Sequence, residues 1–585
     1  MAQLAAAPGL DLLAGIGAQA QALAKLEALS EEIDAALSRR KSNGFLRRGI
    51  KAWKRGDVAR AAKLSLAATD ADPSNAQAYH ILGMSLEKMG HLHKALVTYE
   101  RAHQLDPADP ELLINLGLTA WNLKLTEGAE KMFRLYIAAR PDSPLGYNNL
   151  GSIQCDQGNA STAIETLRSA IYRMPAETVL WNSLATVLAE NGRADESLVF
   201  YEESIRLDPG FSRPHHNIGF AYMHLGQLEN ALQSYDNALE RAVDQTEIIE
   251  AKHSRGICLI GMGRLDEGFR EYEIRNHPRF RAYVHQMTKS PLWKGEDLNG
   301  KRILVIGEQG LGDEFMFANI LPDLQEAVGA DGKLQIAVDK RLVTLFQRSF
   351  PDAQVGAYDD RKLLDPDGTK ELRYVPWATE KGEPDFHMTM GSGLQYLRPR
   401  IEDFPHQAFL KPDPARVADY RAQLEARASG PFIGICWRSM MLGAKRGKYY
   451  SALDSWKPVF ATPGVTFVNL QYGNCRAELA RARQQNGVDI LEIEDLDLKN
   501  DIDGAAALSA ALDLVISAPT AAAATAGGVG TEVWFLTAGR TWPQLGTEEF
   551  PWYRKSRVFS PAKFADWNQL MPDVANALAD FAKND

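Results

Sequence analysis

The feature that most constrains the fold of this chain is a repeat with a period of 34 residues. Prolines recur at this spacing, and a column of small residues follows the same period, with alanine once in place of glycine. The two columns are Pro73, Pro107, Pro141, Pro175 and Pro209, and Gly83, Gly117, Gly151, Ala185 and Gly219. A period of this length indicates one supersecondary unit per repeat, which buries its apolar face only against its neighbours.

Three further columns keep the same register. A turn column is mostly glycine, and a small residue and a bulky residue follow it at fixed offsets. The columns are Gly56, Gly90, Lys124, Gly158, Gly192 and Gly226; Ala61, Ala95, Ala129, Ala163, Ser197 and Ala231; and Ser65, Tyr99, Phe133, Leu167, Tyr201 and Tyr235. Small residues let two helices cross closely, a bulky side chain fills the gap beside them, and proline ends each unit.

This pattern resembles the tetratricopeptide repeat, a helix pair joined by a tight turn. A seventh unit, marked by Gly256, Gly263 and Tyr272, extends the array to about seven helix pairs over residues 43–277. The resemblance implies an all-α tetratricopeptide superhelix with a concave inner surface. Arrays of this kind hold other proteins, so we expect a polypeptide partner on the concave face.

An asparagine column suggests how that partner is held. Asn115, Asn149 and Asn217 each precede the small residue of their own repeat by two positions. A side-chain amide offers both donors and an acceptor, so stacked amides can bind a peptide backbone of any sequence. The column resembles the asparagine ladder in the repeats of protein O-linked N-acetylglucosamine transferases. Alternatively, these amides bond only their own helices or a neighbouring repeat.

Residues 1–42 form an N-terminal segment rich in alanine and leucine, and Leu4–Leu37 has the pattern of an amphipathic helix. We expect it to act as a cap or as a self-association element, and the alternative is a partly ordered tail. It carries charges and lacks a basic start, so it is neither a secretory signal nor a membrane span.

Composition narrows the class of protein and its compartment. The net charge of −10 argues against a nucleic-acid partner, because phosphate contacts usually require a basic surface. The cysteines Cys155, Cys258, Cys436 and Cys475 are scattered and have no metal-ligand spacing, so we expect a reduced, cytoplasmic compartment and no bound metal.

Beyond a linker expected at residues 278–300, the pattern changes to alternating strands and helices. Strand-like runs such as Ile303–Ile306 and Leu334–Val338 alternate with helix-like ones, and the alternation begins again at Pro431. It predicts two α/β halves with parallel sheets, at residues 301–415 and 416–585. Ligands of such sheets gather at the carboxyl ends of the strands.

The glycine loop after the first of these strands, GEQGLGDE, holds the candidate catalytic residues. It is not a phosphate-binding P-loop, because Asp313 and Glu314 stand where the lysine and the serine or threonine are required. A dinucleotide fingerprint fails as well, since Phe315 follows Gly310 and Gly312 where glycine is needed. A carboxylate at a strand end suits a general base, with Asp313 the first candidate and Glu314 the second. Alternatively, Asp313 only caps the following helix.

The order of strand, Gly-Leu-Gly-Asp, helix and Leu-Pro resembles the start of the bacterial heptosyltransferases. The resemblance implies a GT-B fold of two facing Rossmann-like halves, with Asp313 in the catalytic position. Residues 301–415 would then form the acceptor side, and residues 416–585 the side that binds the donor nucleotide.

Candidate donor-binding residues follow the strands of the second half. Arg438 and the cluster of Lys445, Arg446 and Lys448 suit a donor phosphate, although solvated surface charge explains the lysines equally well. The remaining candidates are Gln471 after one strand, and Ser517, Thr520 and Ala521 at a small-residue turn whose backbone N–H groups suit a phosphate. Pro519 and Ala524 replace the aspartate and histidine usual in heptosyltransferase-like proteins, so those two roles are not transferred.

Repeats joined to this transferase half resemble the flagellin glycosyltransferases of alphaproteobacteria. The resemblance implies transfer of a nonulosonic acid such as pseudaminic acid, from a CMP donor to serine or threonine of flagellin on the repeats. We expect a displacement that inverts the sugar and needs no metal, because basic and backbone groups can stabilise the leaving nucleotide. The nucleotide sugar would be a co-substrate, and no other cofactor is expected. One alternative is transfer of N-acetylglucosamine or another hexose to protein. The other is a non-catalytic scaffold or chaperone with a decayed transferase half.

Overall fold

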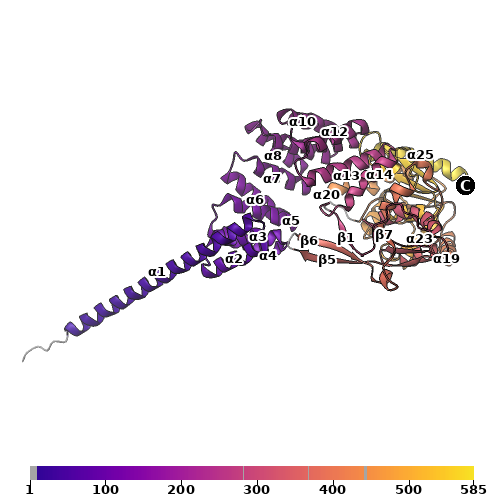
Figure 1. Cartoon of the computed structure of the whole chain (residues 1–585). Coiled ribbons are helices and arrows are strands. Elements are labelled where there is room, and N and C mark those ends of the chain that lie inside the picture. The colour runs from indigo at the N-terminus through magenta and orange to yellow at the C-terminus, as the bar shows by residue number, and fades with distance from the viewer. Residues whose placement is uncertain (1–9, 281, 366–367, 441–443, 585) are drawn as a thin grey trace, which may run out of the picture. The chain divides into compact units, whose positions relative to one another are not determined.

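The computed structural model describes residues 10–280, 282–365, 368–440 and 444–584 (Figure 1). Contacts within the chain divide it into two compact units. The N-terminal unit comprises the residues up to Ile153 together with Leu363–Lys370, and the C-terminal unit comprises Gln154–Lys362 and Glu371–Asp585. The division therefore falls inside the repeat array. Of the predicted N-terminal segment, residues 1–9 lie outside the described residues.

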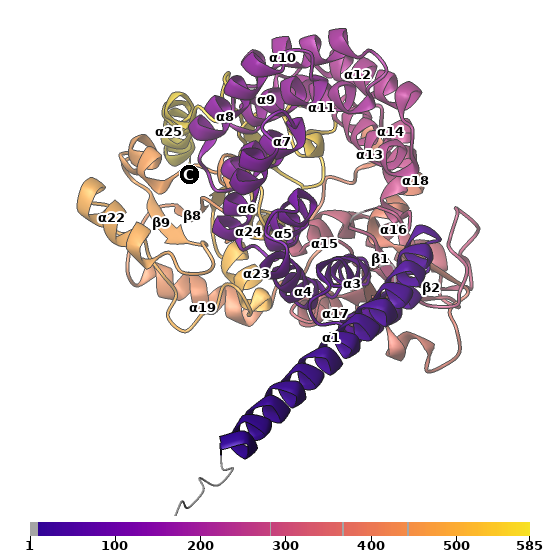
Figure 2. The same ribbon diagram turned by 90° about the vertical axis from the view of Figure 1, so that its left-hand side faces the viewer.

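The repeats form seven helix pairs within the described residues, which confirms the predicted helical repeat region. The pairs are α1 (Leu10–Lys54) with α2 (Val58–Ala71), α3 (Ala76–Lys88) with α4 (Leu92–Leu105), α5 (Pro110–Asn122) with α6 (Thr126–Ala139), α7 (Pro144–Asp156) with α8 (Ala160–Arg173), α9 (Thr178–Glu190) with α10 (Ala194–Leu207), α11 (Ser212–His224) with α12 (Leu228–Arg241), and α13 (Gln245–Gly261) with α14 (Leu265–Tyr272). In the C-terminal unit the last three pairs stack in chain order (Figure 2).

The structure explains why small residues and turn glycines recur in the repeats. Gly83, Gly117 and Gly219 each lie under the bulky side chain of the second helix of their repeat. A Cβ built on Gly83, for example, would lie 2.6 Å from Tyr99 Cδ1. The glycines of the turn column have positive φ, which glycine adopts without steric cost. Lys124 takes the same left-handed conformation, with φ of 64°, because the repeat geometry requires it there.

The first parallel sheet has the order β4-β3-β2-β7. Its strands are β2 (Arg302–Ile306), β3 (Lys333–Val338), β4 (Gln354–Ala357) and β7 (Phe386–Thr389), and its helices are α15 (Leu311–Phe317), α16 (Leu321–Val328) and α17 (Val343–Ser349). In β2, Ile303–Ile306 is an unbroken buried apolar run, as is typical of a parallel strand that helices cover on both faces.

The second parallel sheet has the order β12-β11-β10-β8-β9. Its strands are β8 (Phe432–Cys436), β9 (Thr466–Asn469), β10 (Leu514–Ser517), β11 (Val533–Leu536) and β12 (Ser556–Phe559). The helices of this half are α19 (Pro414–Glu425), α20 (Ala444–Gly447), α21 (Lys457–Phe460), α22 (Arg476–Asn486), α23 (Ile502–Ala510), α24 (Ala521–Val529) and α25 (Trp567–Asn584). The parallel-strand character predicted for the C-terminal region is thus confirmed.

The described residues of 278–300, a range expected as a linker, are part of the folded structure. They contain β1 (Val284–Met287), which pairs in parallel with β6 (Gly368–Tyr374) in a small sheet of order β1-β6-β5, where β5 is Asp359–Asp365. Trp293 and Leu298 are buried in the main apolar core. That core also contains Phe269 and Tyr272 of the last repeat, so α14 packs as part of the C-terminal α/β region.

Candidate functional site

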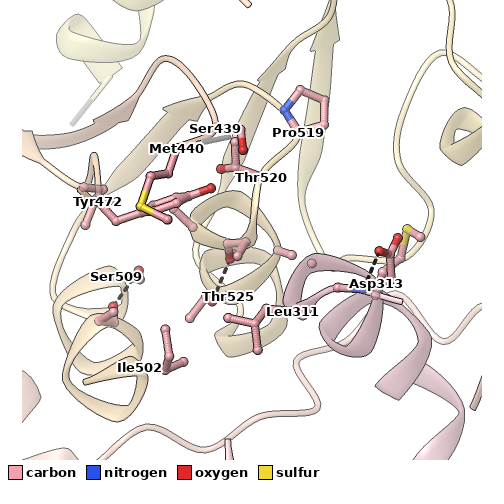
Figure 3. Close-up of a pocket in the computed structure, with 18 of the residues that line it drawn as sticks. Leu311, Asp313, Ser439, Met440, Tyr472, Ile502, Ser509, Pro519, Thr520 and Thr525 are labelled. Carbon is pink, nitrogen blue, oxygen red and sulfur yellow. Dashed lines mark hydrogen bonds between the residues drawn. The ribbon is translucent and has the colours of Figure 1, made fainter. Parts of the chain in front are cut away.

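A cavity of about 430 Å³ lies within the C-terminal unit, between the two parallel sheets (Figure 3). Segments that follow the carboxyl ends of β2, β3, β8, β9 and β10 all contribute side chains to it. This is where ligands of open α/β sheets bind. Its lining includes Gly310, Leu311, Gly312, Asp313, Arg341, Ser439, Met440, Arg446, Tyr450, Tyr472, Lys499, Ile502, Thr520, Ala521 and Tyr553.

Asp313 lines the cavity from the first turn of α15. Its Oδ2 accepts a hydrogen bond from Gly310 N–H at 3.1 Å, so it caps the helix as well as facing the cavity. Burial raises the pKa of this carboxyl to about 6, although the Gly310 hydrogen bond opposes the shift. A carboxylate with this pKa accepts a proton readily near neutral pH.

Glu314 faces away from the cavity and does not line it. Its Oε2 accepts from Asp339 N–H at 3.1 Å, and its Oε1 accepts from the Tyr358 hydroxyl. Burial raises the pKa of Glu314 to about 7. Its position therefore corrects its choice as the second candidate base: consecutive residues of a helix point about 100° apart, so only one of the pair can face the cavity.

The predicted small-residue turn meets the Asp313 loop directly. A Cβ built on Gly312 would lie 3.6 Å from Ala521 N, so the starts of α15 and α24 are in contact. Thr520 and Ala521 line the cavity, and the Thr520 side chain does not cap α24, which leaves its first N–H groups available. Ser517 is fully buried beneath the turn, where its Oγ bonds Ala518 O, and it does not line the cavity.

Arg438 and Gln471 support the cavity wall and do not line it. Arg438 forms an ion pair with Glu478, and its Nε donates to Glu478 Oε1 at 2.9 Å. Gln471 accepts from Arg438 N–H at 3.0 Å and donates to Arg438 O at 2.9 Å. The expectation that Arg438 contacts a donor phosphate is corrected, because Glu478 already neutralises its guanidinium.

Lys448 is turned toward the repeats. Its Nζ donates to the carbonyl oxygen of Glu190, at the end of α9, at 2.8 Å. The neighbouring Tyr449 hydroxyl lies 3.2 Å from His224 Nε2 of α11. These contacts hold the segment that carries Arg446 and Tyr450, both of which line the cavity. Lys448 is therefore corrected from a donor ligand to a support, and the side chain of Lys445 lies outside the described part.

Among the described residues, three cations line the cavity, and of these Arg446 alone was among the sequence candidates. Arg341 pairs with Asp339 just after β3, and Lys499 precedes α23. The rule that ligands gather at strand ends could have indicated Arg341. Nothing local marks Lys499, because it reaches the cavity only through the fold. Tyr450, Tyr472 and Met440 add an apolar and aromatic wall.

The asparagine column is mostly paired between repeats. The amide nitrogen of Asn115 lies 2.8 Å from His80 Nε2, and that of Asn217 donates to Asn182 Oδ1 at 3.1 Å. These two amides therefore bond a neighbouring repeat, which was the alternative to binding a peptide backbone. Asn149 differs, because its amide nitrogen is buried without a hydrogen-bond partner among the described residues.

In the described part of the chain, no group of three or more His, Cys, Asp or Glu side chains is arranged to hold a metal ion. No described helix is long and apolar enough to cross a membrane.

A known protein resembles this chain over most of its length. Protein FlbA of Caulobacter vibrioides is 41% identical to it over 538 residues, which cover 92% of this chain and 90% of that protein. The chain belongs to the FlbA family. The FlbA match is long enough to include both the repeats and the α/β halves. Residues 76–109, 179–211 and 212–242 match the tetratricopeptide repeat family, which indicates protein–protein interaction.

Weaker relatives share a smaller part. The probable UDP-N-acetylglucosamine–peptide N-acetylglucosaminyltransferase SPINDLY of Hordeum vulgare is 27% identical over 155 residues, 25% of this chain and 16% of that one. A tetratricopeptide repeat protein from Parabacteroides merdae is 15% identical, with a TM-score of 0.37, over 41% of this chain and 95% of its own.

Proposed function

We propose that this FlbA-family protein is a protein O-glycosyltransferase. The cavity would bind a nucleotide sugar, and the repeats would hold the acceptor protein. The observation that carries the proposal is Asp313, a carboxylate with a raised pKa that lines the cavity against the start of α24. The two parallel sheets on either side of the cavity are consistent with a GT-B arrangement of acceptor and donor halves.

The cavity lining suits each part of a nucleotide sugar. The N–H groups that begin α24, together with Arg446 and Lys499, suit the phosphate. Tyr472 and Tyr450 suit stacking against a base or a sugar ring. Such a donor needs both an apolar wall and a few convergent polar groups, and this cavity has both.

The proposed chemistry is a single displacement. The hydroxyl oxygen of an acceptor serine or threonine attacks the anomeric carbon, while the bond from that carbon to the phosphate oxygen breaks. Asp313 takes the hydroxyl proton, and the nucleotide leaves with the electron pair, stabilised by the cations and the N–H groups of α24. One displacement inverts the configuration at the anomeric carbon.

We further propose flagellin as the acceptor and a nonulosonic acid such as pseudaminic acid, carried on CMP, as the sugar. This choice rests on the resemblance to the alphaproteobacterial flagellin glycosyltransferases. Transfer of N-acetylglucosamine or another hexose is the alternative within the same chemistry, and the name of the SPINDLY relative supports it.

The test is intact-mass analysis of flagellin co-expressed with the protein and the enzymes that make the donor. We expect a mass increase that identifies the sugar, and its loss in Asp313→Asn. The exposed Asp331→Asn removes a carboxylate from the same half and is the matched control. Unmodified flagellin with the wild-type protein, for every donor supplied, would contradict the proposal.

A non-catalytic scaffold or chaperone is the second candidate. It is favoured by Pro519 and Ala524, which line the cavity where the resemblance expects an aspartate and a histidine, and by the occupied guanidinium of Arg438. A thermal-shift panel of nucleotide sugars separates the two candidates. The enzyme should be stabilised by its donor, whereas a scaffold should respond to none.

A further inference from the structure

The last repeat is joined to the Asp313 loop by a buried ion pair. Arg275, in the 3₁₀ turn Glu273–Asn276 after α14, donates through Nε to Glu308 Oε2 at 2.9 Å and through Nη2 to Glu308 Oε1 at 2.8 Å. Both side chains are buried, and Glu308 also accepts from Gly391 N–H at 2.6 Å. A bidentate pair of this kind fixes both position and orientation. It therefore fixes the start of the loop relative to the repeat.

A second contact acts one residue further along the loop. Gln309 has φ of 62°, a left-handed conformation that a side chain disfavours. Its amide nitrogen donates to the hydroxyl of Tyr272, the bulky-column residue of the last repeat. The guanidinium of Arg275 lies over the Tyr272 ring, 4.4 Å from its centre. The unusual backbone turn is thus held from the repeat side.

We propose that Tyr272 and Arg275 are positioning residues for Asp313, acting through Gln309 and Glu308. The loop from Gly307 to Gly310 connects β2 to α15, whose first turn carries Asp313, so its conformation sets where that carboxylate lies. The inference rests on the proposed function, in which Asp313 is the base. It gives the last repeat a part in catalysis in addition to binding the acceptor.

The sharpest variant is Tyr272→Phe, which removes one hydroxyl and leaves the ring packing intact. Tyr235→Phe is the matched control, because Tyr235 occupies the same column one repeat earlier and its hydroxyl contacts only Met223 Sδ among the described residues. Both variants are made in the full chain.

Two measurements are made on each variant. We expect Tyr272→Phe to speed hydrogen–deuterium exchange of the 307–313 backbone several-fold. We expect it to lower kcat about tenfold with the donor KM unchanged, because a small misplacement of a catalytic group costs rate more than binding. Gln309→Gly keeps the left-handed turn without the side-chain bond, and combining it with Tyr272→Phe should add no further loss.

The outcomes separate this inference from the proposed function. If Asp313→Asn is inactive while Tyr272→Phe matches Tyr235→Phe in exchange and in kcat, the positioning role is wrong and the proposed function stands. If Asp313→Asn is fully active, Asp313 is not the base, and Tyr272 and Arg275 then cannot be positioning residues for it. Faster exchange and lower kcat in Tyr272→Phe alone support the inference.

Discussion

Two consecutive carboxylates, Asp313 and Glu314, lie in the first turn of α15 in contrasting surroundings. Asp313 faces the cavity and receives one backbone hydrogen bond, whereas Glu314 is enclosed between Tyr358 and Asp339 N–H. Burial raises the pKa of both groups. The chemistry they can perform differs because only one of them can reach a ligand.

The raised pKa of Asp313 predicts the pH dependence of transfer. The base is active when ionised, and its pKa is about 6. We therefore expect kcat/KM to rise with pH, with a slope of about one log unit per pH unit below this value, and to level off above it. Steady-state rates from pH 5 to pH 8 with intact-mass detection provide the measurement. A flat profile across that range would exclude Asp313 as the base.

The raised pKa of Glu314 predicts that its contribution to stability decreases as pH rises. The contribution of a salt-bridged acid, whose pKa is lowered, increases instead. Its folded pKa of about 7 lies above the reference value of 4.5, so the folded state binds a proton more tightly than the unfolded chain. This contribution is complete below pH 4.5 and is lost as pH rises through 7. Glu314→Gln has no ionisable group at this position, so it should not show this loss of stability as pH rises.

The free energy of unfolding of wild type minus that of Glu314→Gln should fall by on the order of 2–3 kcal/mol between pH 4.5 and pH 8. Denaturant titrations at several pH values measure it. The exposed Glu326→Gln is the control and should leave the pH dependence of wild type unchanged. An equal pH dependence in wild type and Glu314→Gln would show that Glu314 ionises alike in both states.

Part of this site could be predicted from local sequence. Asp313 and Thr520 follow buried strands, and ligands of α/β sheets gather at strand ends. Arg438 follows a strand as well, but its partner Glu478 is 40 residues further on and reaches it only through the fold. Lys499 belongs to no motif. Local sequence patterns carry no information about charge pairing between distant segments, so the partner of Arg438 could not be predicted.

At the scale of the repeat helices, the glycine columns are packing devices. In α5, a Cβ built on Gly117 would lie 2.8 Å from Phe133 Cδ1 of α6. Real atoms do not approach so closely, so the two helices must move apart to accept a larger residue. The repeat pattern was predictable because each unit specifies this close approach within 34 residues of sequence.

Gly117→Ala should therefore lower the stability of the N-terminal unit by about 1–3 kcal/mol. Gly128→Ala is the matched control: Gly128 lies in α6 with nothing within 4 Å of a built Cβ. It should raise stability by about 0.5–1 kcal/mol, because alanine is the better helix former. Calorimetric unfolding of the full-length variants compares them. Equal effects at both positions would contradict the packing argument.

Helix α1 exposes a stripe of large aliphatic side chains before it reaches the repeats. They are Leu23, Leu26, Leu29, Ile33 and Leu37, each more than half exposed. Four of them are separated by three, seven and four residues, which fits one face of a coiled coil. The self-association expected for this segment is therefore still a prediction, with a second copy of α1 as the partner.

Sedimentation velocity tests it on the full chain. We expect concentration-dependent association that Leu26→Glu combined with Ile33→Glu abolishes, because a coiled-coil seam does not accept buried charges. Ala28→Glu, on another face of the same helix, is the control and should associate like wild type. A wild-type chain that sediments as a monomer at every concentration would contradict the prediction.

At the scale of the whole molecule, the end of the repeat pattern in the sequence and the division between the two compact units lie at different residues. Sequence periodicity places the end of the repeats near residue 277, because the repeat pattern stops there. Compactness instead places a division at Ile153, inside the array. Periodicity records how each unit packs on the next, and it carries no information about which repeats also pack on another domain.

The last repeats belong to the C-terminal unit because they share its apolar core. Ile260, Leu265, Phe269 and Tyr272 of the last repeat are buried in one cluster with residues of both sheets. Burying each such side chain contributes about 1.5–3 kcal/mol, so the four together contribute on the order of 6–12 kcal/mol. That is comparable to the whole stability of an ordinary domain. The α/β halves should therefore not be stable without the last repeats.

Two truncated chains test this. A fragment of residues 142–585 keeps α7 and all later helices, and we expect it to fold cooperatively and to bind the donor as the full chain does. A fragment of residues 278–585 contains every residue of the cavity lining but lacks the last repeat. We expect it to aggregate or to lose near-ultraviolet circular dichroism, because its exposed core faces water. If the shorter fragment folds and binds the donor, the α/β halves are stable without the last repeat, and its four buried side chains are not needed for their fold.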